Sequence, residues 1–352
     1  MIRKIFLAAV VFFCFLSTQA QSDSTNPAPT ITGSVDAYFR YNFNDPKSGT
    51  TNNLTSFTNS QNSFQLGMAS VRADHSWGKA SATVDLGFGP RAEEFSYGDP
   101  SHSTLFAVKQ AYVSYAVSDK FKLTIGKWAT HIGYEVTDAY LNRNYSMDYM
   151  FSYGPFSHTG LKAEIGLGEK SGLMFGVANT TDVVAEAGSR RYALAQFSTG
   201  TADDKVKAFL NYQGSYGGSF NTSQFDLVLT GAVSDKFNIG YNGTVQTVKP
   251  DGGDSDSWWG SALYFTADPT AAFGITLRGE YFHNEKGVVG SGTLIDGTNI
   301  FDVTLSPNFR VGNLTIIPEL RLDNSKLAIF EKNDGTATKS TVTGILAATY
   351  HF

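Results

Sequence analysis

The sequence predicts an all-β fold, namely a transmembrane antiparallel up-and-down β-barrel of about sixteen strands that follows an N-terminal signal peptide. Three observations point to this fold. The composition is poor in charge and rich in aromatic residues, apolar residues recur at every second position, and the connecting segments alternate between short turns and long loops. A soluble β-sandwich shares the second feature but gives no reason for the third.

The composition narrows the class of protein first. Of the 352 residues, 41% are hydrophobic, 14% aromatic and 17% charged, whereas soluble domains carry about 25% charged residues. This excludes a disordered or nucleic-acid-binding chain, which needs high net charge or a basic face. The mean hydropathy is -0.17, and the longest apolar run is shorter than the roughly 20 residues of a membrane-spanning helix. A β-barrel tolerates these values because its strands alternate lipid-facing and water-facing residues.

Residues 1–20 have the form of a secretory signal peptide. A basic start precedes the apolar run Ile5–Leu16, and small residues before the end suit cleavage after Ala20. A membrane anchor is disfavoured because the run is short. Lipidation at the single cysteine, Cys14, is disfavoured because two phenylalanines precede it where small residues are needed.

The mature chain is acidic and has no cysteine. Removal of residues 1–20 leaves 25 basic and 32 acidic residues, a net charge of -7. An exported chain without disulfides suits a bacterial envelope, and we expect it in the cell outer membrane. A polar linker over 21–30 precedes a single barrel domain over 31–352. The net charge by itself weakly favours cations as the permeating ions.

Strand periodicity begins directly after the linker. In 34–43 the apolar side chains share one face and the polar ones share the other; the two sets are Val35, Ala37, Phe39, Tyr41 and Phe43, and Ser34, Asp36, Tyr38, Arg40 and Asn42. The same alternation recurs in 80–88, 237–246 and 273–281. Period-two alternation indicates strands with one wet and one apolar face.

The lengths of the connections alternate along the chain. The short turns fall near 76–79, 118–120, 167–171, 199–204, 234–236, 268–270 and 311–313. The long loops fall near 44–61, 90–104, 128–158, 180–190, 213–224, 248–257, 284–298 and 324–338. Seven turns and eight loops imply about sixteen strands with both termini on the short-turn side, which is the bacterial outer-membrane pattern.

The last strand agrees with this reading. From Val342 to Phe352 every second residue is apolar apart from one glycine, and the chain ends on the aromatic Phe352. Outer-membrane barrels commonly end in this way, so we expect the barrel-assembly machinery to recognise this strand as a partner.

Several segments resemble the OmpL-like family of bacterial outer-membrane β-barrel porins. They are Phe121-Lys-Leu-Thr-Ile-Gly-Lys-Trp128, Gly133-Tyr-Glu135, Asn142-Arg-Asn-Tyr145 and Pro155-Phe-Ser-His-Thr-Gly160, with Gln110-Ala-Tyr112, Arg278-Gly-Glu-Tyr-Phe282 and Pro318-Glu-Leu-Arg-Leu-Asp323 outside this stretch. Asn142 and Asn144 depart from the family's usual Ser-Arg-Ser spacing. The resemblance implies a diffusion pore without enzymatic activity, whose solutes are mostly unassigned.

We therefore expect a water-filled channel for passive diffusion of small hydrophilic solutes or ions. The expected partners are outer-membrane lipid, lipopolysaccharide and those solutes, with no nucleic acid and no cofactor; porins of this size often form homotrimers. Two alternatives stay open. One is a plugged barrel whose loops bind or adhere, and the other is a barrel hydrolase such as a lipase.

The third long loop, Trp128–His158, is the candidate for a constriction. In many porins the third external loop folds into the lumen, and this one carries Glu135 and Arg143 among several tyrosines. The alternative is a surface loop that shields the barrel mouth.

Charged residues on the wet faces of the strands are expected to line the pore, because a lipid-facing Arg or Lys costs about 2–4 kcal/mol at the midplane. Together with the two loop residues, the pore-lining candidates are Arg40, Lys122, Glu135, Arg143, Lys162, Glu164, Arg278, Glu280, Glu319, Arg321 and Asp323. Other wet-face acids are Asp36, Asp85 and Asp226. The set on 278–280 and 319–323 could form a transverse field or, somewhat more readily, a neutral ion-paired network.

Three positions break the alternation. Lys109 falls on the apolar register near the outer loop, where it could reach past the lipid to water. Pro318 lies within a strand paired on both sides, which predicts a bulge, and a one-residue slip near 68–69 predicts another.

No motif points to catalysis or a metal. The acidic loop 251–256 lacks the EF-hand spacing, the six histidines are dispersed, and no G-x-S-x-G elbow or P-loop occurs. We expect no metal site and no catalytic residues.

Overall fold

The computed structural model describes residues 27–99, 104–185, 190–216, 219–289 and 293–352. The predicted signal peptide and most of the predicted linker lie outside these residues. In the described part of the chain, no helix is long and apolar enough to cross a membrane.

The described residues form eighteen strands and four short helices. The strands are β1 (Thr30–Asn42), β2 (Ser63–Trp77), β3 (Ala80–Phe88), β4 (Val108–Ser118), β5 (Phe121–Ala129), β6 (Ser157–Gly166), β7 (Gly172–Ala178), β8 (Arg191–Gly200), β9 (Val206–Tyr216), β10 (Phe220–Ser234), β11 (Phe237–Pro250), β12 (Asp256–Thr270), β13 (Phe273–His283), β14 (Asn299–Val311), β15 (Leu314–Ser325), β16 (Phe330–Glu331), β17 (Ala337–Thr338) and β18 (Ser340–His351). The helices are α2 (Pro90–Phe95), η1 (Thr104–Ala107), η2 (Ala139–Leu141) and α3 (Tyr149–Ser152).

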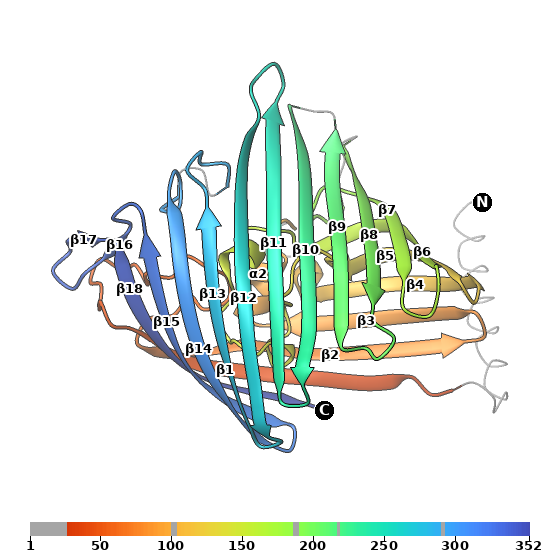
Figure 1. The fold of residues 1–352 in the computed structure, drawn as a ribbon, viewed down its shortest axis with the longest axis horizontal. Helices are drawn as coiled ribbons and strands as arrows, with labels where there is room; N and C mark the ends of the chain where they lie inside the picture. Colours follow the sequence, from red (N-terminus) through yellow and green to blue (C-terminus); the bar gives the residue numbers. More distant parts are fainter. Residues whose placement is uncertain (1–26, 100–103, 186–189, 217–218, 290–292) are drawn as a thin grey trace, which may run out of the picture.

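Sixteen of these strands close into one antiparallel barrel, which confirms the predicted fold (Figure 1). Each strand pairs with its neighbours in the chain, and β1 closes the barrel by pairing with β18. The two remaining strands, β16 and β17, form a small hairpin in the loop between β15 and β18.

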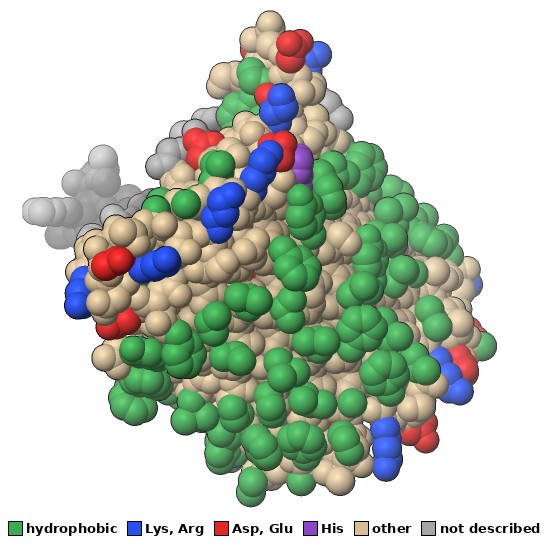
Figure 2. Space-filling view, turned by 60° about the vertical axis from the view of Figure 1, so that its left-hand side comes forward, with side chains coloured by type: hydrophobic (Ala, Val, Ile, Leu, Met, Phe, Trp, Pro, Cys, Tyr) green, Lys and Arg blue, Asp and Glu red, His purple; other side chains and the backbone are tan. Residues whose placement is uncertain are grey.

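The two faces of the wall have the predicted characters. On β1, Asp36 and Arg40 point into the barrel and are 3% and 1% exposed, whereas Ile31 and Val35 are 54% and 42% exposed. Apolar side chains likewise cover a broad part of the outer wall, and charged side chains gather at its margins (Figure 2). This exterior suits the hydrocarbon of a membrane.

Two loops, predicted at 213–224 and 248–257, are shorter than predicted because the flanking strands extend into them. β9 and β10 extend to Tyr216 and from Phe220, and β11 and β12 extend to Pro250 and from Asp256. These strands rise above their neighbours in Figure 1. Their polar residues face inward and bond across the strands, as in the amide pair Gln213 to Gln224 at 2.7 Å. The polar residues from which a longer loop was predicted therefore lie on the water-facing side of the strands.

The strand irregularities differ from the expectations in two of three cases. The slip near 68–69 is confirmed as a bulge, since the β1–β2 register shifts at Asp36/Ala37. No bulge occurs at Pro318: β14 and β15 keep one register, and only their pairing lapses where Pro318 faces Pro307. The two facing prolines remove the backbone N–H donors from both strands at this position, but no extra residue is inserted in either strand.

Lys109 does not reach out past the lipid. The β3–β4 register shifts between Asp85 and Leu86, so Lys109 is the extra residue of a bulge and turns inward. Its Nζ lies 3.1 Å from Asp85 and 2.6 Å from Asp138. A buried ammonium needs such partners, and the bulge supplies the change of face that the sequence register concealed.

Candidate functional site

The loop between β5 and β6, residues 130–156, lies inside the barrel. Although it has little regular structure, its residues Tyr145 and Met147 are fully buried and Tyr149 is 1% exposed. Its backbone first follows the wall, where the amide of Gly133 donates to Asp226 of β10. The loop then crosses the interior, because Asp138 pairs with Lys109 on the far side, at β4.

Wall carboxylates hold this loop by its backbone. Glu319 of β15 accepts hydrogen bonds from the consecutive amides of residues 145 and 146, at 2.7 and 3.0 Å. Glu280 of β13 accepts in the same way from residues 149 and 150, at 2.7 and 2.9 Å. Loop amides have no strand partner, and a buried amide without an acceptor is costly. Each carboxylate therefore satisfies two donors and fixes the loop at one point.

Glu280 also caps the N-terminus of the helix α3. The first amides of any helix lack partners within the helix, and residues 149 and 150 begin α3. Asp148, at the N-cap, accepts from the amide of Phe151 at 2.6 Å. The N-terminus of this short helix is thus capped by one loop carboxylate and one wall carboxylate.

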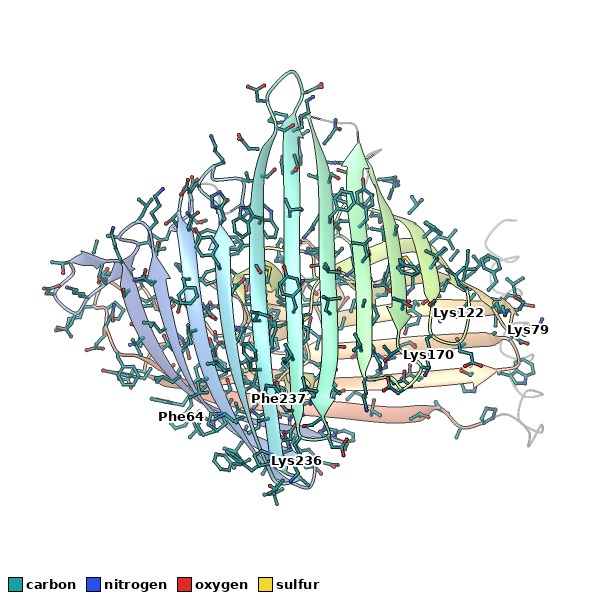
Figure 3. The ribbon with its side chains drawn as sticks, in the orientation of Figure 1. Phe64, Lys79, Lys122, Lys170, Lys236 and Phe237 are labelled. Carbon is teal, nitrogen blue, oxygen red and sulfur yellow. The ribbon has the colours of Figure 1, made fainter. Side chains whose placement is uncertain are left out.

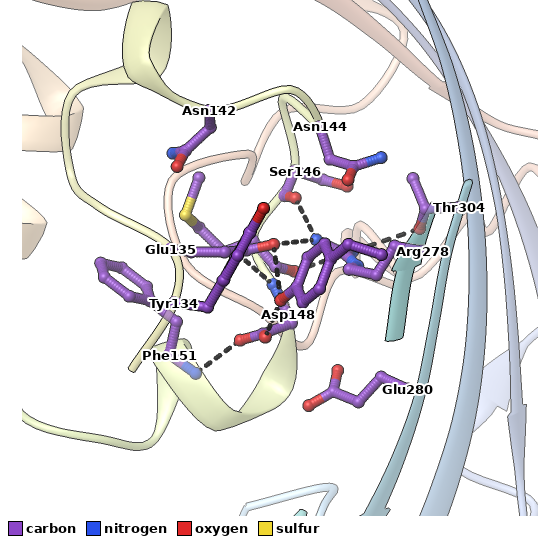
Figure 4. A network of polar contacts seen from close by, with 12 residues as sticks. Tyr134, Glu135, Asn142, Asn144, Ser146, Asp148, Phe151, Arg278, Glu280 and Thr304 are labelled. Carbon is purple, nitrogen blue, oxygen red and sulfur yellow. Dashed lines mark hydrogen bonds and ion pairs between the residues drawn. The ribbon is translucent and has the colours of Figure 1, made fainter. Parts of the chain in front are cut away.

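Arg278 of β13 is the centre of a buried ion-pair network (Figure 4). Its side chain is fully buried, and its guanidinium donates to Glu135 at 2.6 Å and to the carbonyl of Ser146 at 2.7 Å. The same group pairs with Asp302 of β14 at 3.1 Å. The planar guanidinium carries five donors, so one residue can bind a loop acid, a loop carbonyl and a wall acid together.

Asp302 links this network to the next strand. Arg321 of β15 pairs with Asp302 at 2.7 Å and with Asp323 at 2.8 Å. Tyr149 of the loop donates its hydroxyl to Asp323 at 2.9 Å. Asp302 thus connects β13 and β15, which are both neighbours of β14.

On the neighbouring part of the wall, the loop contacts β1 and a second loop. Tyr145 donates its hydroxyl to Asp36 at 2.5 Å. Arg91 of α2, which is fully buried, lies 3.7 Å from the same carboxylate and packs against the rings of Phe57 and Tyr145. Three loops, 43–62, 89–107 and 130–156, therefore meet inside the barrel.

One loop carboxyl has a strongly shifted pKa. Burial raises the pKa of Glu135 to about 8, and the neighbouring Asp148 carboxylate raises it further in the same direction, while Arg278 opposes both. Desolvation penalises the charged form of a buried acid. Burial therefore favours the protonated form of Glu135 near neutral pH.

The opposite part of the wall is open. At the short-turn end, a cavity of about 430 Å³ is lined by residues of β4 to β8 and of the turn between β4 and β5; its charged residues are Asp119, Lys120, Lys122 and Glu164. Lys122 lies 2.8 Å from Glu164 and Lys162 lies 3.7 Å from it. The Lys122 and Glu164 side chains are 48% and 35% exposed, so these charges face water in the lumen.

A smaller hollow, about 290 Å³, lies beneath the loop and is lined by residues that include Glu135, Arg143 and Tyr264. Arg143 is 39% exposed and pairs with Asp268 of β12 at 3.0 Å. Arg310 of β14 contacts the same carboxylate at 2.5 Å.

The structure divides the eleven predicted pore-lining residues into two groups. Lys122, Lys162, Glu164 and Arg143 are at least partly exposed. The buried group consists of Arg40, Glu135, Arg278, Glu280, Glu319, Arg321 and Asp323. Arg40 donates to the carbonyls of Thr51 and Ser60, so it anchors the loop after β1 in the way that Arg278 anchors the third.

Sequence reasoning missed two members of the network. Asp302 alternates with Thr304 and Ser306, all fully buried, and this polar face could have been found by the same period-two test. Arg91 carries no such signal, because it lies on the short helix α2 within a loop.

A family model described as "Putative beta-barrel porin-2, OmpL-like" matches residues 29–352. No curated protein matches the chain. Among solved structures, the outer membrane channel DcaP of Acinetobacter baumannii is similar, with a TM-score of 0.60 and 11% identity over 94% of this chain and 99% of that one. The anion-selective porin from Comamonas acidovorans has a TM-score of 0.59 and 12% identity over 92% and 99%. OmpT of Vibrio cholerae has a TM-score of 0.58 and 10% identity over 92% and 97%. At these identities the likeness concerns the fold.

Proposed function

Since this chain belongs to the OmpL-like β-barrel porin family of the bacterial outer membrane, we propose that small hydrophilic solutes diffuse passively through its lumen past the loop 130–156. The observation that carries this proposal is the internal loop, which is fixed to the wall on one side and leaves the wall of β4 to β8 uncovered at the short-turn end. Permeation requires no bond to be made, only a wet path whose width and charge select the solute.

The two groups of charged residues have different tasks in this proposal. Lys122, Lys162, Glu164 and Arg143 face water and contact the passing solute. The buried residues hold the loop, which sets the width of the path. A loop held at several separate points resists displacement, because each clamp restricts a different segment.

The test is conductance of the purified mature barrel in planar bilayers, with liposome swelling in sugars of graded size. We expect discrete conductance steps and a swelling rate that falls with sugar size. Stable insertion without conductance and without swelling would overturn the proposal and favour a plugged barrel with a binding or adhesive role. Hydrolysis of ester substrates by the same preparation would favour a barrel hydrolase.

We also propose partners for the two ends of the barrel. At the short-turn end, β18 is followed directly by the exposed Phe352, whose amide and carbonyl form hydrogen bonds with Gly33 of β1. This closing strand is the segment that the barrel-assembly machinery would recognise. At the other end, the long loops would meet lipopolysaccharide. OmpT of Vibrio cholerae has been solved in a trimer form, and we propose a homotrimer for this chain.

A further inference from the structure

Four acidic residues of the inner wall are buried and bind the loop or neighbouring arginines. Glu280 and Glu319 each accept two loop amides, Asp36 binds a loop tyrosine, and Asp302 lies between two arginines. All four are at most 5% exposed. These four acids therefore contribute little to the surface that a solute meets.

On the exposed wall of β5 and β6, lysines outnumber acidic residues. Glu164 is shared by Lys122 and Lys162, at 2.8 and 3.7 Å. The Lys162 ammonium lies 5.3 Å from the centre of the Trp128 ring, which holds it against the wall by a cation–π contact. One carboxylate thus serves two lysines, and it is closer to Lys122.

A third lysine lies on the same side of the barrel. Lys207 of β9 is exposed, and it has the same parity as Asn211, which is buried on the inner face. Among the described residues it has no carboxylate within ion-pair distance. Across β5 to β9, the exposed inner face therefore holds three lysines and one glutamate.

A similar arrangement occurs near the short-turn end of β12 and β14. Asp268 is shared by Arg143 and Arg310, at 3.0 and 2.5 Å. The trio with the reverse balance is Lys109 between Asp85 and Asp138, and its Lys109 and Asp85 side chains are only 3% exposed. Cationic excess is thus present on two separated parts of the inner face, one on β5 to β9 and one on β12 and β14.

The rim at the short-turn end does not add to this excess. The short turns that connect the strands carry five lysines and five acids, namely Lys79, Lys120, Lys170, Lys205 and Lys236, and Asp119, Glu169, Asp203, Asp204 and Asp235. Lys79, Lys170 and Lys236 are labelled at the turns in Figure 3, and Lys122, the second residue of β5, lies near the same end on the strand itself. The charge that distinguishes the lumen is therefore on the wall.

We infer that this channel selects small anions over cations, and that Lys122 and Lys162 are its main selectivity-determining residues. The inference rests on the proposed channel function and reverses the weak cation preference that the net charge suggests. Fixed charges on a low-dielectric wall concentrate counter-ions in front of them, and they act within about one Debye length, roughly 10 Å at 0.1 M salt.

The test is the reversal potential of the full mature barrel in a tenfold KCl gradient. We expect the wild type to pass chloride in preference to potassium, and the double variant Lys122→Gln with Lys162→Gln to lower the chloride-to-potassium permeability ratio by about twofold or more. The matched control is Lys79→Gln with Lys170→Gln, which removes the same charge from the turns and should leave the ratio unchanged.

Three results would overturn the inference while leaving the channel intact: potassium preference in the wild type, no change in the double variant, or an equal change in the turn control. Lys122→Arg with Lys162→Arg should retain the wild-type ratio, which separates lost charge from altered folding. Absence of conductance in the wild type would be a different failure, because it would overturn the proposed channel itself.

Discussion

The two sides of the barrel wall have the same alternation of polar and apolar residues, but their inward-facing charged side chains differ in exposure. Along β13 to β15 the inward charges Arg278, Glu280 and Glu319 are at most 5% exposed and fully paired. Along β5 and β6 the inward charges Lys122 and Glu164 are 48% and 35% exposed. Residue type and alternation are the same on both sides, so the difference comes from the loop 130–156, which reaches the first side and leaves the second uncovered.

This difference shows how a wide barrel forms a narrow path without a second domain. A loop in the lumen has backbone amides that need acceptors, and carboxylates that accept two amides are strong acceptors in a low-dielectric interior. The acids on one side of the wall bind the loop, whereas the lysines on the other side stay exposed to water and to the solute. Variants that disturb this division should have effects of different size, and the largest is expected for the loop itself.

The largest effect should follow removal of the crossing segment. Deletion of residues 140–149, replaced by two glycines, removes both amide partners of Glu319 and one of the two amide partners of Glu280. The freed wall then becomes wet, so both sides should conduct, and single-channel conductance should rise about twofold or more, as expected for a wider aqueous barrel. Planar-bilayer recording measures this change.

A suitable control is deletion of residues 251–254, at the tip of the β11–β12 hairpin. This tip lies at the end of the tall strands and far along the chain from the loop contacts (Figure 1). Its removal should leave conductance unchanged. If a correctly folded 140–149 deletion conducted like the wild type, the loop would not set the width of the path.

The next effect concerns stability and compares one arginine from each kind of site. Arg278→Ala would leave the buried Glu135 and Asp302 without their shared partner. Breaking a buried pair in this way typically costs about 3–5 kcal/mol. Arg143→Ala breaks a pair whose arginine is 39% exposed, and such pairs contribute at most about 1 kcal/mol. Denaturant unfolding of the two variants measures the difference, and equal losses would remove the distinction between the two sides.

The sequence predicted the barrel well because alternation and turn length are local signals. The inner-face positions of Arg40, Arg278 and Arg321 followed directly from period-two counting. Which of them would meet the loop could not be predicted, since that depends on contacts between residues more than a hundred positions apart, as for Tyr145 and Glu319. The inward turn of Lys109 was concealed for a different reason: a bulge changes the parity by one, and residue types do not mark it.

The smallest effect should be a dependence of loop anchoring on pH. Because the pKa of Glu135 is raised from 4.5 to about 8 in the folded barrel, the folded state keeps a proton that the unfolded state has lost. The free energy of unfolding should therefore fall as pH rises from about 4.5 to about 8. Glu135→Gln removes this titratable group and should flatten the dependence of the free energy of unfolding on pH in this range. The exposed turn variant Glu169→Gln should not. Denaturant midpoints at pH 5, 7 and 9 measure both profiles. A Glu135→Gln profile parallel to that of the wild type would show that Arg278 keeps the carboxylate charged throughout, and the anchored side of the wall would then be insensitive to pH.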